Sequence, residues 1–280
     1  MPIELEQLHH CHGGRQGFYR HRSAECGGEM HFSVYVPPHR AGDRLPVLYY
    51  LSGLTCGPDV FPIKAGAQRL AAELGLVLVV PDTSPRETGI KGATEDWDFG
   101  EGAGFYLDAT EAPWSDRFRM YSYVTRELPA LVEEEFPVDP ARCGIFGHSM
   151  GGHGALVIGL RNPARYRSIS AFAPIVAPSR VPWGHKALPR YLGENRDEWA
   201  RYDACDLVRR HPHDGTLLVD QGLEDPFLAE QLKPELFEAA CAEAGQPLEL
   251  RRHAGYDHGY YFIQTFIDDH LRHHAAALGA

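Results

Sequence analysis

The pentapeptide Gly147-His148-Ser149-Met150-Gly151 matches the pattern G-x-S-x-G. In acyl-transfer enzymes with this pattern, the serine lies on a sharp turn between a strand and a helix, where small neighbours leave its hydroxyl exposed. The apolar run 143–146 predicts the strand, and the run 152–160 predicts the helix. A chance glycine-rich turn is the alternative interpretation, but the strand–turn–helix setting favours Ser149 as a nucleophile.

Serine becomes reactive only when a base removes its proton, and a carboxylate must orient that base. In α/β-hydrolases the acid follows the serine along the chain, and the histidine follows the acid. The segment after the apolar run 216–219 contains Asp220, Glu224 and Asp225. We favour Asp225 as the acid, because Asp220 lies at the strand end, where an aspartate suits a turn-capping role.

Position rather than residue type predicts the base, because 16 histidines occur in the chain. His258 lies on a loop after the strand-like run 248–252 and just before a helical run. His253 is the competing residue, but it belongs to the strand itself. We therefore expect Ser149, Asp225 and His258 to form a catalytic triad.

A triad also needs N–H donors for the negative charge that develops on the carbonyl oxygen. One donor is expected to be the amide of Met150, directly after the nucleophile, and the other an amide in a loop after an early strand. Leu54 lies in such a loop, after the strand-like run 47–50. An ordinary glycine turn would be the simpler interpretation of this loop alone, but next to a complete triad we predict Leu54 as the second donor.

Short runs of apolar or alternating residues predict the strands that carry these loops: 30–36, 47–51, 76–80, 143–146, 168–172, 216–219 and 248–252. Helical patterns span 64–74, 121–135 with an expected kink at Pro129, 152–160, 228–244 and 260–278. This alternation predicts an α/β-hydrolase fold with a doubly wound, mostly parallel sheet. Segments 85–116 and 177–206 fit this pattern least and are expected as excursions at the edge of the active site. No linker or repeat divides the chain, so residues 1–280 are predicted to form a single domain.

The chain has 280 residues and a formal net charge of −11, which disfavours binding to nucleic-acid phosphates. Its six cysteines are scattered without a C-x-x-C pair, so we expect reduced thiols rather than a zinc site or a disulfide framework. The acidic segment 1–6 does not resemble a signal peptide, and the longest apolar run, 76–80, is too short to cross a bilayer. We expect a soluble, cytoplasmic protein that binds neither nucleic acid nor membrane.

Taken together, these and further motifs resemble the S-formylglutathione hydrolase (esterase D) family. The matching segments are 52–56, 64–69, 81–86, 97–100, 102–106, 147–155, 182–184, 220–222 with Asp225, and 255–258. They cover nearly the whole chain and are far more specific than G-x-S-x-G alone. The sequence departs from the family at 87–92, which replaces a stretch that usually begins with glycine, and at Gly259, where many members have serine. Neither change touches the triad.

The resemblance implies a serine thioesterase that hydrolyses S-formylglutathione to glutathione and formate, the closing step of formaldehyde detoxification. The resemblance implies a homodimer, and the Ser-His-Asp chemistry itself requires no metal and no cofactor. Transferred to this sequence, the triad is Ser149, Asp225 and His258, and the oxyanion donors are Leu54 and Met150. Cys56 matches a cysteine beside the substrate pocket that is associated with sensitivity to thiol reagents.

Aromatic side chains suit the acyl side of such a pocket, because a formyl group needs little room. The candidates, each with core packing as the alternative, are Trp97, Phe105 and Trp183. Glutathione carries two carboxylates, so a net-acidic chain needs local cations to bind it. The basic residues in suitable loops are Lys64, Arg86, Lys91 and Lys186. Solvation of an exposed lysine is the simpler alternative for each.

Two other classes of function are alternatives to hydrolysis. A non-catalytic binding module would lack a member of the triad, and none is missing. An acyltransferase that uses an alcohol acceptor would need a long apolar groove, for which the sequence offers no segment. Among hydrolases, the alternative is a general short-chain carboxylesterase.

Overall fold

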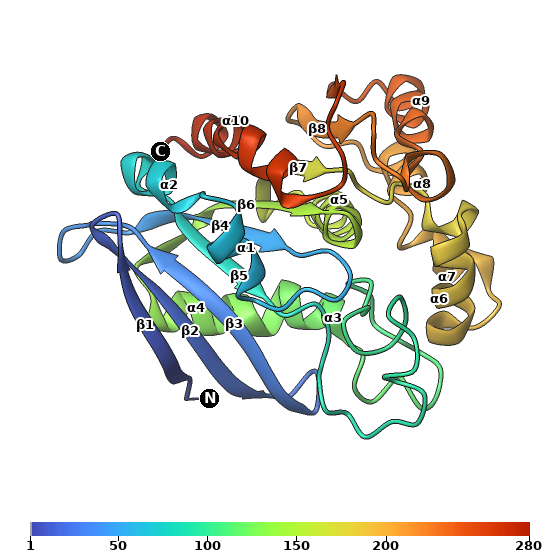
Figure 1. Ribbon diagram of the computed structural model, residues 1–280, viewed down its shortest axis with the longest axis horizontal. Helices are drawn as coiled ribbons and strands as arrows, with labels where there is room; N and C mark the ends of the chain where they lie inside the picture. The colour runs from blue at the N-terminus through green and yellow to red at the C-terminus, as the bar shows by residue number, and fades with distance from the viewer. Residues whose placement is uncertain (1) are drawn as a thin grey trace.

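The computed structural model describes residues 2–280 and contains a nine-stranded sheet (Figure 1). The strands lie in the order β1-β2-β3-β5-β4-β6-β7-β8-β9. Strands β4 to β9 run parallel to one another, and β1 to β3 extend the sheet in antiparallel fashion. The bounds are β1 Glu4–Cys11, β2 Gly14–Ser23, β3 Gly28–Val36, β4 Leu45–Leu51, β5 Val77–Pro81, β6 Val138–His148, β7 Tyr166–Phe172, β8 Leu217–Gly222 and β9 Leu248–His253. This mostly parallel sheet confirms the predicted fold class.

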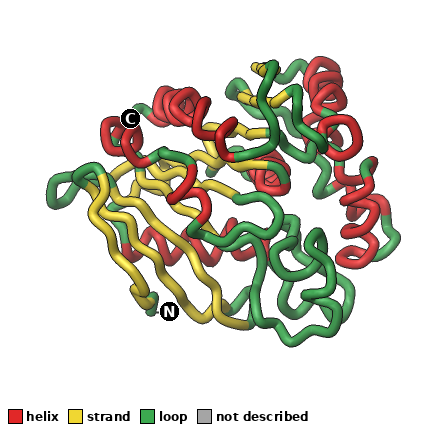
Figure 2. Tube along the Cα trace, in the orientation of Figure 1, coloured by secondary structure: helices red, strands yellow, loops and turns green. Residues whose placement is uncertain are grey.

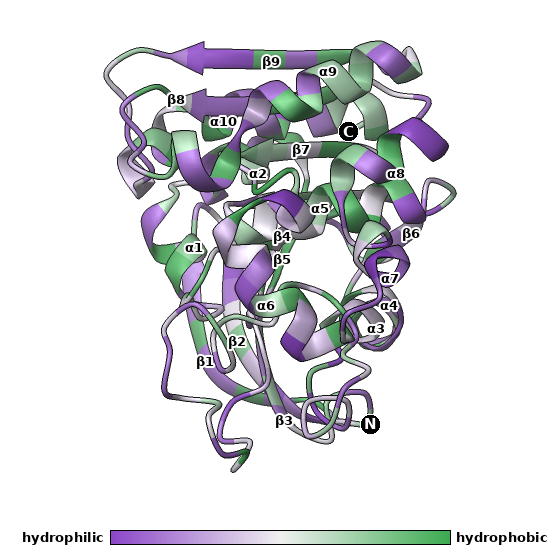
Figure 3. Cartoon of the chain, turned by 90° about the vertical axis from the view of Figure 1, so that its right-hand side faces the viewer, coloured by the Kyte–Doolittle hydropathy of each residue, from purple (hydrophilic) through white to green (hydrophobic). Residues whose placement is uncertain are grey.

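The central strands are apolar along their length because helices cover both faces of the sheet. All residues of β5 and all but the first of β4 are buried. Strands that are buried on both faces have continuous apolar sequences rather than alternating ones. The central strands could therefore be predicted from their apolar runs. The edge strand β9 is largely hydrophilic by comparison (Figure 3).

Two N-terminal strands were not predicted from the sequence. Seven of the eight residues of β1 are exposed, so this strand has no buried face to produce an alternating pattern. It is held by backbone pairing with β2, which in turn pairs with β3. Backbone hydrogen bonds leave no trace in residue type, and a polar edge strand is therefore hard to recognise.

Helices pack on the two faces of the sheet, with α10 above and α4 below in the view of Figure 1. Helix α10 contacts β6, β7 and α2, whereas α5 packs on β6, β7 and α8. The bounds are α1 Val60–Lys64, α2 Gln68–Leu74, α3 Met120–Ser122, α4 Leu128–Glu135, α5 Met150–Arg161, α6 Pro182–Leu192, α7 Arg196–Ala200, α8 Ala204–Arg210, α9 Pro234–Ala244 and α10 Tyr260–Leu278, with short turns η1 Tyr123–Glu127, η2 Pro178–Arg180 and η3 Leu228–Leu232. The helices predicted at 152–160 and 260–278 are confirmed.

The other three predicted helices are not single regular α-helices. In the run 64–74, only residues 68–74 form a helix, α2; Lys64 is the last residue of α1, and Gly66 between the two helices has a φ of +68°. The run 121–135 is helical throughout, but the π-helical turn η1 directly precedes α4, and Pro129 is the second residue of α4. The run 228–244 divides at Lys233, whose φ is +48°, into η3 and α9.

The two segments expected as excursions at the edge of the active site differ in secondary structure. Segment 85–116 is loop with only isolated bridges, and it forms the large green region at the lower right of Figure 2. Segment 177–206 is instead mostly helical and contains η2, α6, α7 and the start of α8. Its polar residues are helix caps: Asn195 accepts from the Asp197 amide at α7, and Asp203 accepts from backbone amides at α8.

Candidate active site

Ser149 occupies the turn between β6 and α5 in a backbone conformation that side chains rarely adopt, with φ +58° and ψ −119°. Two glycines make this turn possible. A Cβ on Gly151 would lie 1.9 Å from the carbonyl oxygen of Leu51, and a Cβ on Gly147 would lie 2.3 Å from the carbonyl oxygen of Gly151. The spacing of the G-x-S-x-G pattern therefore follows from close packing of β4, β6 and α5 around Ser149.

The structure brings Asp225 and His258 together. Asp225 Oδ2 lies 2.5 Å from His258 Nδ1. The same carboxylate accepts hydrogen bonds from the backbone amide of Phe227 at 2.8 Å and from Nε2 of Gln221 at 3.3 Å. Asp225 is 5% exposed, so these bonds fix its orientation away from bulk water. A carboxylate held in this way can fix the tautomer and the ring plane of a histidine base.

Asp220 does not cap a turn, contrary to the sequence-based interpretation. It lies within β8, fully buried, and both carboxylate oxygens contact Arg251 at 2.6 Å. His270 Nε2 lies 3.2 Å from it. Burial alone would raise the pKa of Asp220, but hydrogen bonds from His270 and Arg251 outweigh that effect and hold the pKa well below its usual value. Asp220 is thus an ionised structural residue, and it makes no contact with His258.

A cavity of about 170 Å³ contains Ser149 and His258 together. Its remaining lining residues are Gly53, Leu54, Cys56, Trp97, His148, Trp183, Phe227 and Tyr260. The ring centroids of Trp97 and Trp183 are 5.9 Å apart, and those of Phe227 and His258 are 5.0 Å apart. The predicted pocket residues Cys56, Trp97 and Trp183 therefore lie at the cavity. Its small size suits a short acyl group.

Sequence reasoning missed three lining residues, Phe227, His148 and Tyr260. Each is adjacent or nearly adjacent in sequence to a predicted triad residue, and that proximity is the signal that could have identified them. The rings of His148 and His258 are 4.4 Å apart between centroids. Burial, and then the charge of His258, lower the pKa of His148 well below its usual value. A neutral His148 does not oppose a positive charge on His258.

The loop that carries Leu54 lies directly against Ser149, since a Cβ on Gly53 would be 3.2 Å from the Cβ of Ser149. The Thr55 amide donates to Gly102 O at 2.8 Å and the Cys56 amide to Gly53 O at 3.3 Å. These bonds fix the loop. Leu54 lines the cavity, and Met150, the other predicted donor, directly follows Ser149 as the first residue of α5.

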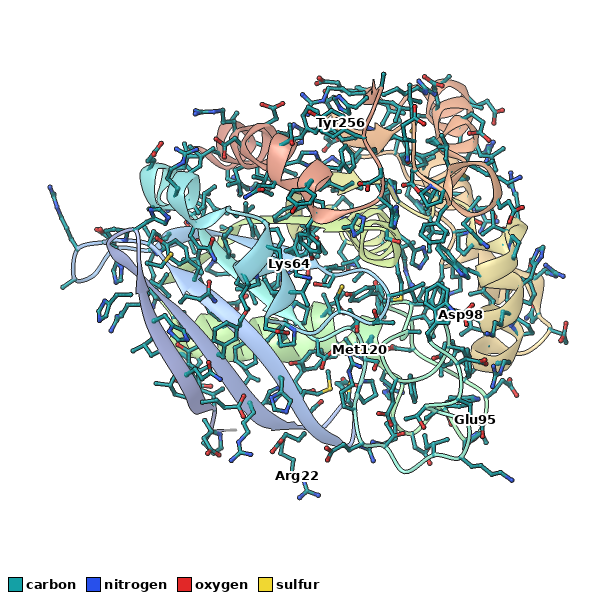
Figure 4. All side chains as sticks on the ribbon, viewed as in Figure 1. Arg22, Lys64, Glu95, Asp98, Met120 and Tyr256 are labelled. Carbon is teal, nitrogen blue, oxygen red and sulfur yellow. The ribbon has the colours of Figure 1, made fainter. Side chains whose placement is uncertain are left out.

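The predicted basic residues have different surroundings. Arg86 pairs with Asp82 at 2.8 Å and donates to Cys56 O at 3.2 Å, so it supports the loop. Lys186 pairs with Asp98, labelled in Figure 4, and with Asp96 at 3.3 Å, and it does not line the cavity of Ser149.

Phe105, a candidate for the pocket, is instead a core residue. It is fully buried, its ring lies 6.1 Å from that of His153, and it does not line the cavity of Ser149. Its carbonyl oxygen lies 3.1 Å from His153 Nε2. Packing, the alternative weighed for this residue, explains its position.

Comparisons with known proteins identify the family. Residues 23–273 match the family model described as "Putative esterase". The chain belongs to this esterase family. The esterase is 52% identical to the S-formylglutathione hydrolase of Rattus norvegicus over 99% of this chain and 100% of the relative, and 53% identical to that of Bos taurus over 100% of both. The predicted resemblance to S-formylglutathione hydrolases is confirmed, and the protein is a serine hydrolase.

Solved structures agree with the fold of the esterase. The S-formylglutathione hydrolase of Agrobacterium tumefaciens matches with a TM-score of 0.96 and 52% identity, over 98% of this chain and 99% of that one. A fluorophosphonate-binding serine hydrolase of Staphylococcus aureus matches with a TM-score of 0.74 and 18% identity, over 94% and 98% of the chains, which shows a shared fold alone. Among residues 2–280, no helix has the length and apolar character needed to span a bilayer. All six cysteines of the esterase are free thiols.

Proposed function

We propose that this protein hydrolyses S-formylglutathione to glutathione and formate. The observation that carries the proposal is the identity of 52–53% to S-formylglutathione hydrolases along nearly the whole chain. The catalytic residues are Ser149, His258 and Asp225, and the oxyanion donors are the amides of Leu54 and Met150. The contact of 2.5 Å between Asp225 and His258 and the shared cavity of Ser149 and His258 support these assignments.

The reaction proceeds in two acyl transfers. Ser149 Oγ attacks the formyl carbon while His258 Nε2 takes the serine proton, and the amides of Leu54 and Met150 stabilise the oxyanion. The C–S bond then breaks, and His258 gives the proton to the departing thiolate, which leaves a formyl ester on Ser149. A water molecule, deprotonated by His258, attacks this ester, and formate departs as the serine recovers its proton. Asp225 keeps Nδ1 of His258 protonated throughout.

The acyl side of the pocket selects small groups. Trp97, Trp183 and Phe227 surround a space of about 170 Å³ next to Ser149 and His258. Cys56 lines the same space, and its side chain limits the room beside the oxyanion loop. Lys186 contributes by holding the segment around Asp98, through the ion pairs described above, next to Trp97.

A comparison of kcat/KM on S-formylglutathione and on p-nitrophenyl acetate tests the proposal, with Ser149→Ala protein prepared in parallel to exclude a contaminating esterase. Each rate is divided by the rate of the uncatalysed hydrolysis. We expect a clear preference for the thioester, because only that substrate offers a glutathione portion to bind. Equal normalised values would instead identify a general short-chain carboxylesterase.

We further propose that the protein acts as a cytoplasmic homodimer in formaldehyde catabolism, as the family resemblance implies. The strand β1 is an unpaired sheet edge on which Leu5 and Leu8 are 50% and 45% exposed, and such an edge is a surface suited to association. Light scattering with size-exclusion chromatography measures the mass in solution against the 31.2 kDa of one chain. A monomeric mass at micromolar concentration would contradict the dimer.

A further inference from the structure

Lys64 places a positive charge beside the catalytic cavity that no carboxylate neutralises. Within residues 2–280, Arg86 is paired with Asp82, and Lys186 is paired with two aspartates, whereas Lys64 forms no ion pair. Figure 4 shows Lys64 on α1, on the side of the molecule that faces the viewer. Its Nζ lies 5.7 Å from the centre of the Tyr260 ring.

Tyr260 connects Lys64 to the site of reaction. It lines the small cavity that contains Ser149, and it also lines a second cavity of about 360 Å³. The other residues of the second cavity are Lys64, Tyr261 and Gln264. A further sign of proximity comes from Cys56 at the first cavity: burial raises the pKa of its thiol, and the charge of Lys64 opposes that rise. The two cavities therefore adjoin at Tyr260.

A glutathione thioester needs both spaces. The first cavity, of about 170 Å³, has room for a small acyl group but not for a tripeptide, so the glutathione portion must extend beyond its rim. That portion carries two carboxylates, and the chain itself has a net charge of −11, which repels anions unless a local cation attracts them. Past Tyr260, the second cavity offers the side chain of Lys64 together with the side-chain amide of Gln264 and the exposed Tyr261.

We propose that Lys64 binds a carboxylate of the glutathione portion of the substrate, in the cavity that it forms with Tyr260, Tyr261 and Gln264. This inference rests on the proposed thioesterase function and adds a residue that determines specificity. Arg86 and Lys186 cannot serve in the same way, because each already neutralises a carboxylate of the protein. Lys91, on the loop 85–116, lines neither cavity.

The test compares S-formylglutathione with its diethyl ester, in which both carboxylates are neutral. Steady-state KM and kcat are measured for both thioesters with the wild type, Lys64→Gln and Lys64→Arg. Arg22→Gln is the matched control, because Arg22 is an exposed cation at the far lower edge of the molecule in Figure 4. An exposed ion pair changes affinity by roughly two- to fivefold. In Lys64→Gln, we expect KM for S-formylglutathione to rise by that factor while kcat is retained. We also expect KM for S-formylglutathione and for the diethyl ester to become equal in this variant.

Lys64→Arg, which keeps the charge, should retain the preference, and Arg22→Gln should behave as the wild type. An unchanged KM for S-formylglutathione in Lys64→Gln would overturn the proposal, as would an equal rise in KM for the diester, since the effect would then not depend on substrate charge. Failure of the thioesterase function is distinguishable, because it would appear in the wild type as no preference for S-formylglutathione over p-nitrophenyl acetate.

Discussion

Arg251 Nε and Nη2 each lie 2.6 Å from an oxygen of Asp220, so the guanidinium and the carboxylate form a bidentate ion pair that joins β9 to β8. Asp225, in the loop that follows β8, faces His258 instead. The two aspartates of this region thus have separate roles. One stabilises the sheet edge, and the other contacts His258, the base in the proposed mechanism.

Substitution of the two aspartates should separate these roles. Asp225→Asn is expected to lower kcat by roughly 10⁴-fold, because His258 loses the group that fixes its tautomer. Asp220→Asn is expected to leave kcat of the folded enzyme nearly unchanged but to lower the free energy of unfolding by about 3 kcal/mol, since Arg251 loses its charged partner. Kinetics and urea unfolding of both variants test this, and the reverse pattern would make Asp220 the catalytic acid.

Ser149→Ala should abolish turnover on thioesters and oxygen esters alike. Loss of a nucleophile from a catalytic triad lowers kcat on the order of a millionfold. The fold should persist, because the glycines around the turn, and not the hydroxyl, provide the close packing. Circular dichroism and activity measurements check both parts, and activity within tenfold of the wild type would remove Ser149 from the mechanism.

Cys56 should be the target of thiol reagents without being required for catalysis. Burial raises the pKa of its thiol, so the reactive thiolate is scarce at neutral pH and increases as the pH rises. The inactivation rate should therefore increase with pH up to and beyond about 9, the ordinary thiol range. Cys56→Ser should stay active and resist inactivation, whereas Cys11→Ser, a control at a half-buried thiol far from the pocket, should remain sensitive. Inactivation of Cys56→Ser at the wild-type rate would point to another cysteine.

Acyl length should affect kcat/KM strongly. One added methylene in a tight pocket changes discrimination by roughly 10- to 200-fold. S-acetylglutathione should therefore be a poorer substrate than S-formylglutathione after each rate is divided by that of uncatalysed hydrolysis, and S-lactoylglutathione should be poorer still. Trp183→Ala should weaken this discrimination, because Trp183 lines the cavity. A flat series in the wild type would contradict a restrictive acyl pocket.

Acid should destabilise the fold through its buried histidines. Burial lowers the pKa of His153 to about 4, whereas an unfolded chain binds the proton near 6.5. The unfolded state thus holds more protons between these values, and stability falls as the pH decreases from 6.5 to 4. His153→Gln, which keeps a donor for the Phe105 carbonyl, should show a shallower decrease than the wild type, measured as urea midpoints at each pH. The exposed His9→Gln should follow the wild-type curve, and equal slopes for all three proteins would contradict this role for His153.

The sequence was most informative where chemistry and backbone geometry are local. The turn at Ser149 and the loops of Asp225 and His258 each follow a recognisable strand, and the parallel sheet brings their ends to the same side. Helix ends were less predictable, because a single residue such as Lys233, with its φ of +48°, can divide one helical pattern into two elements.

Long-range pairing was the main feature that the sequence concealed. From the sequence, Lys186 is a free cation, but its partner Asp98 lies 88 positions away in the chain. Asp220 was predicted as a turn residue, because the sequence does not show that Arg251 lies beside it. Composition gives the number of charges but not which of them meet. The choice among four candidate cations for glutathione therefore required the structure.

The edge-to-face pair of Trp97 and Trp183 gives the protein an optical consequence. Two of its four tryptophans are at the catalytic cavity, and Trp97 is 56% exposed whereas Trp183 is 6% exposed. Contact with solvent shifts indole emission to longer wavelength, so a group that enters the cavity and covers Trp97 should shift its emission to shorter wavelength. Intrinsic fluorescence should therefore report occupancy directly, so that affinities of unreactive glutathione thioethers can be read without a label.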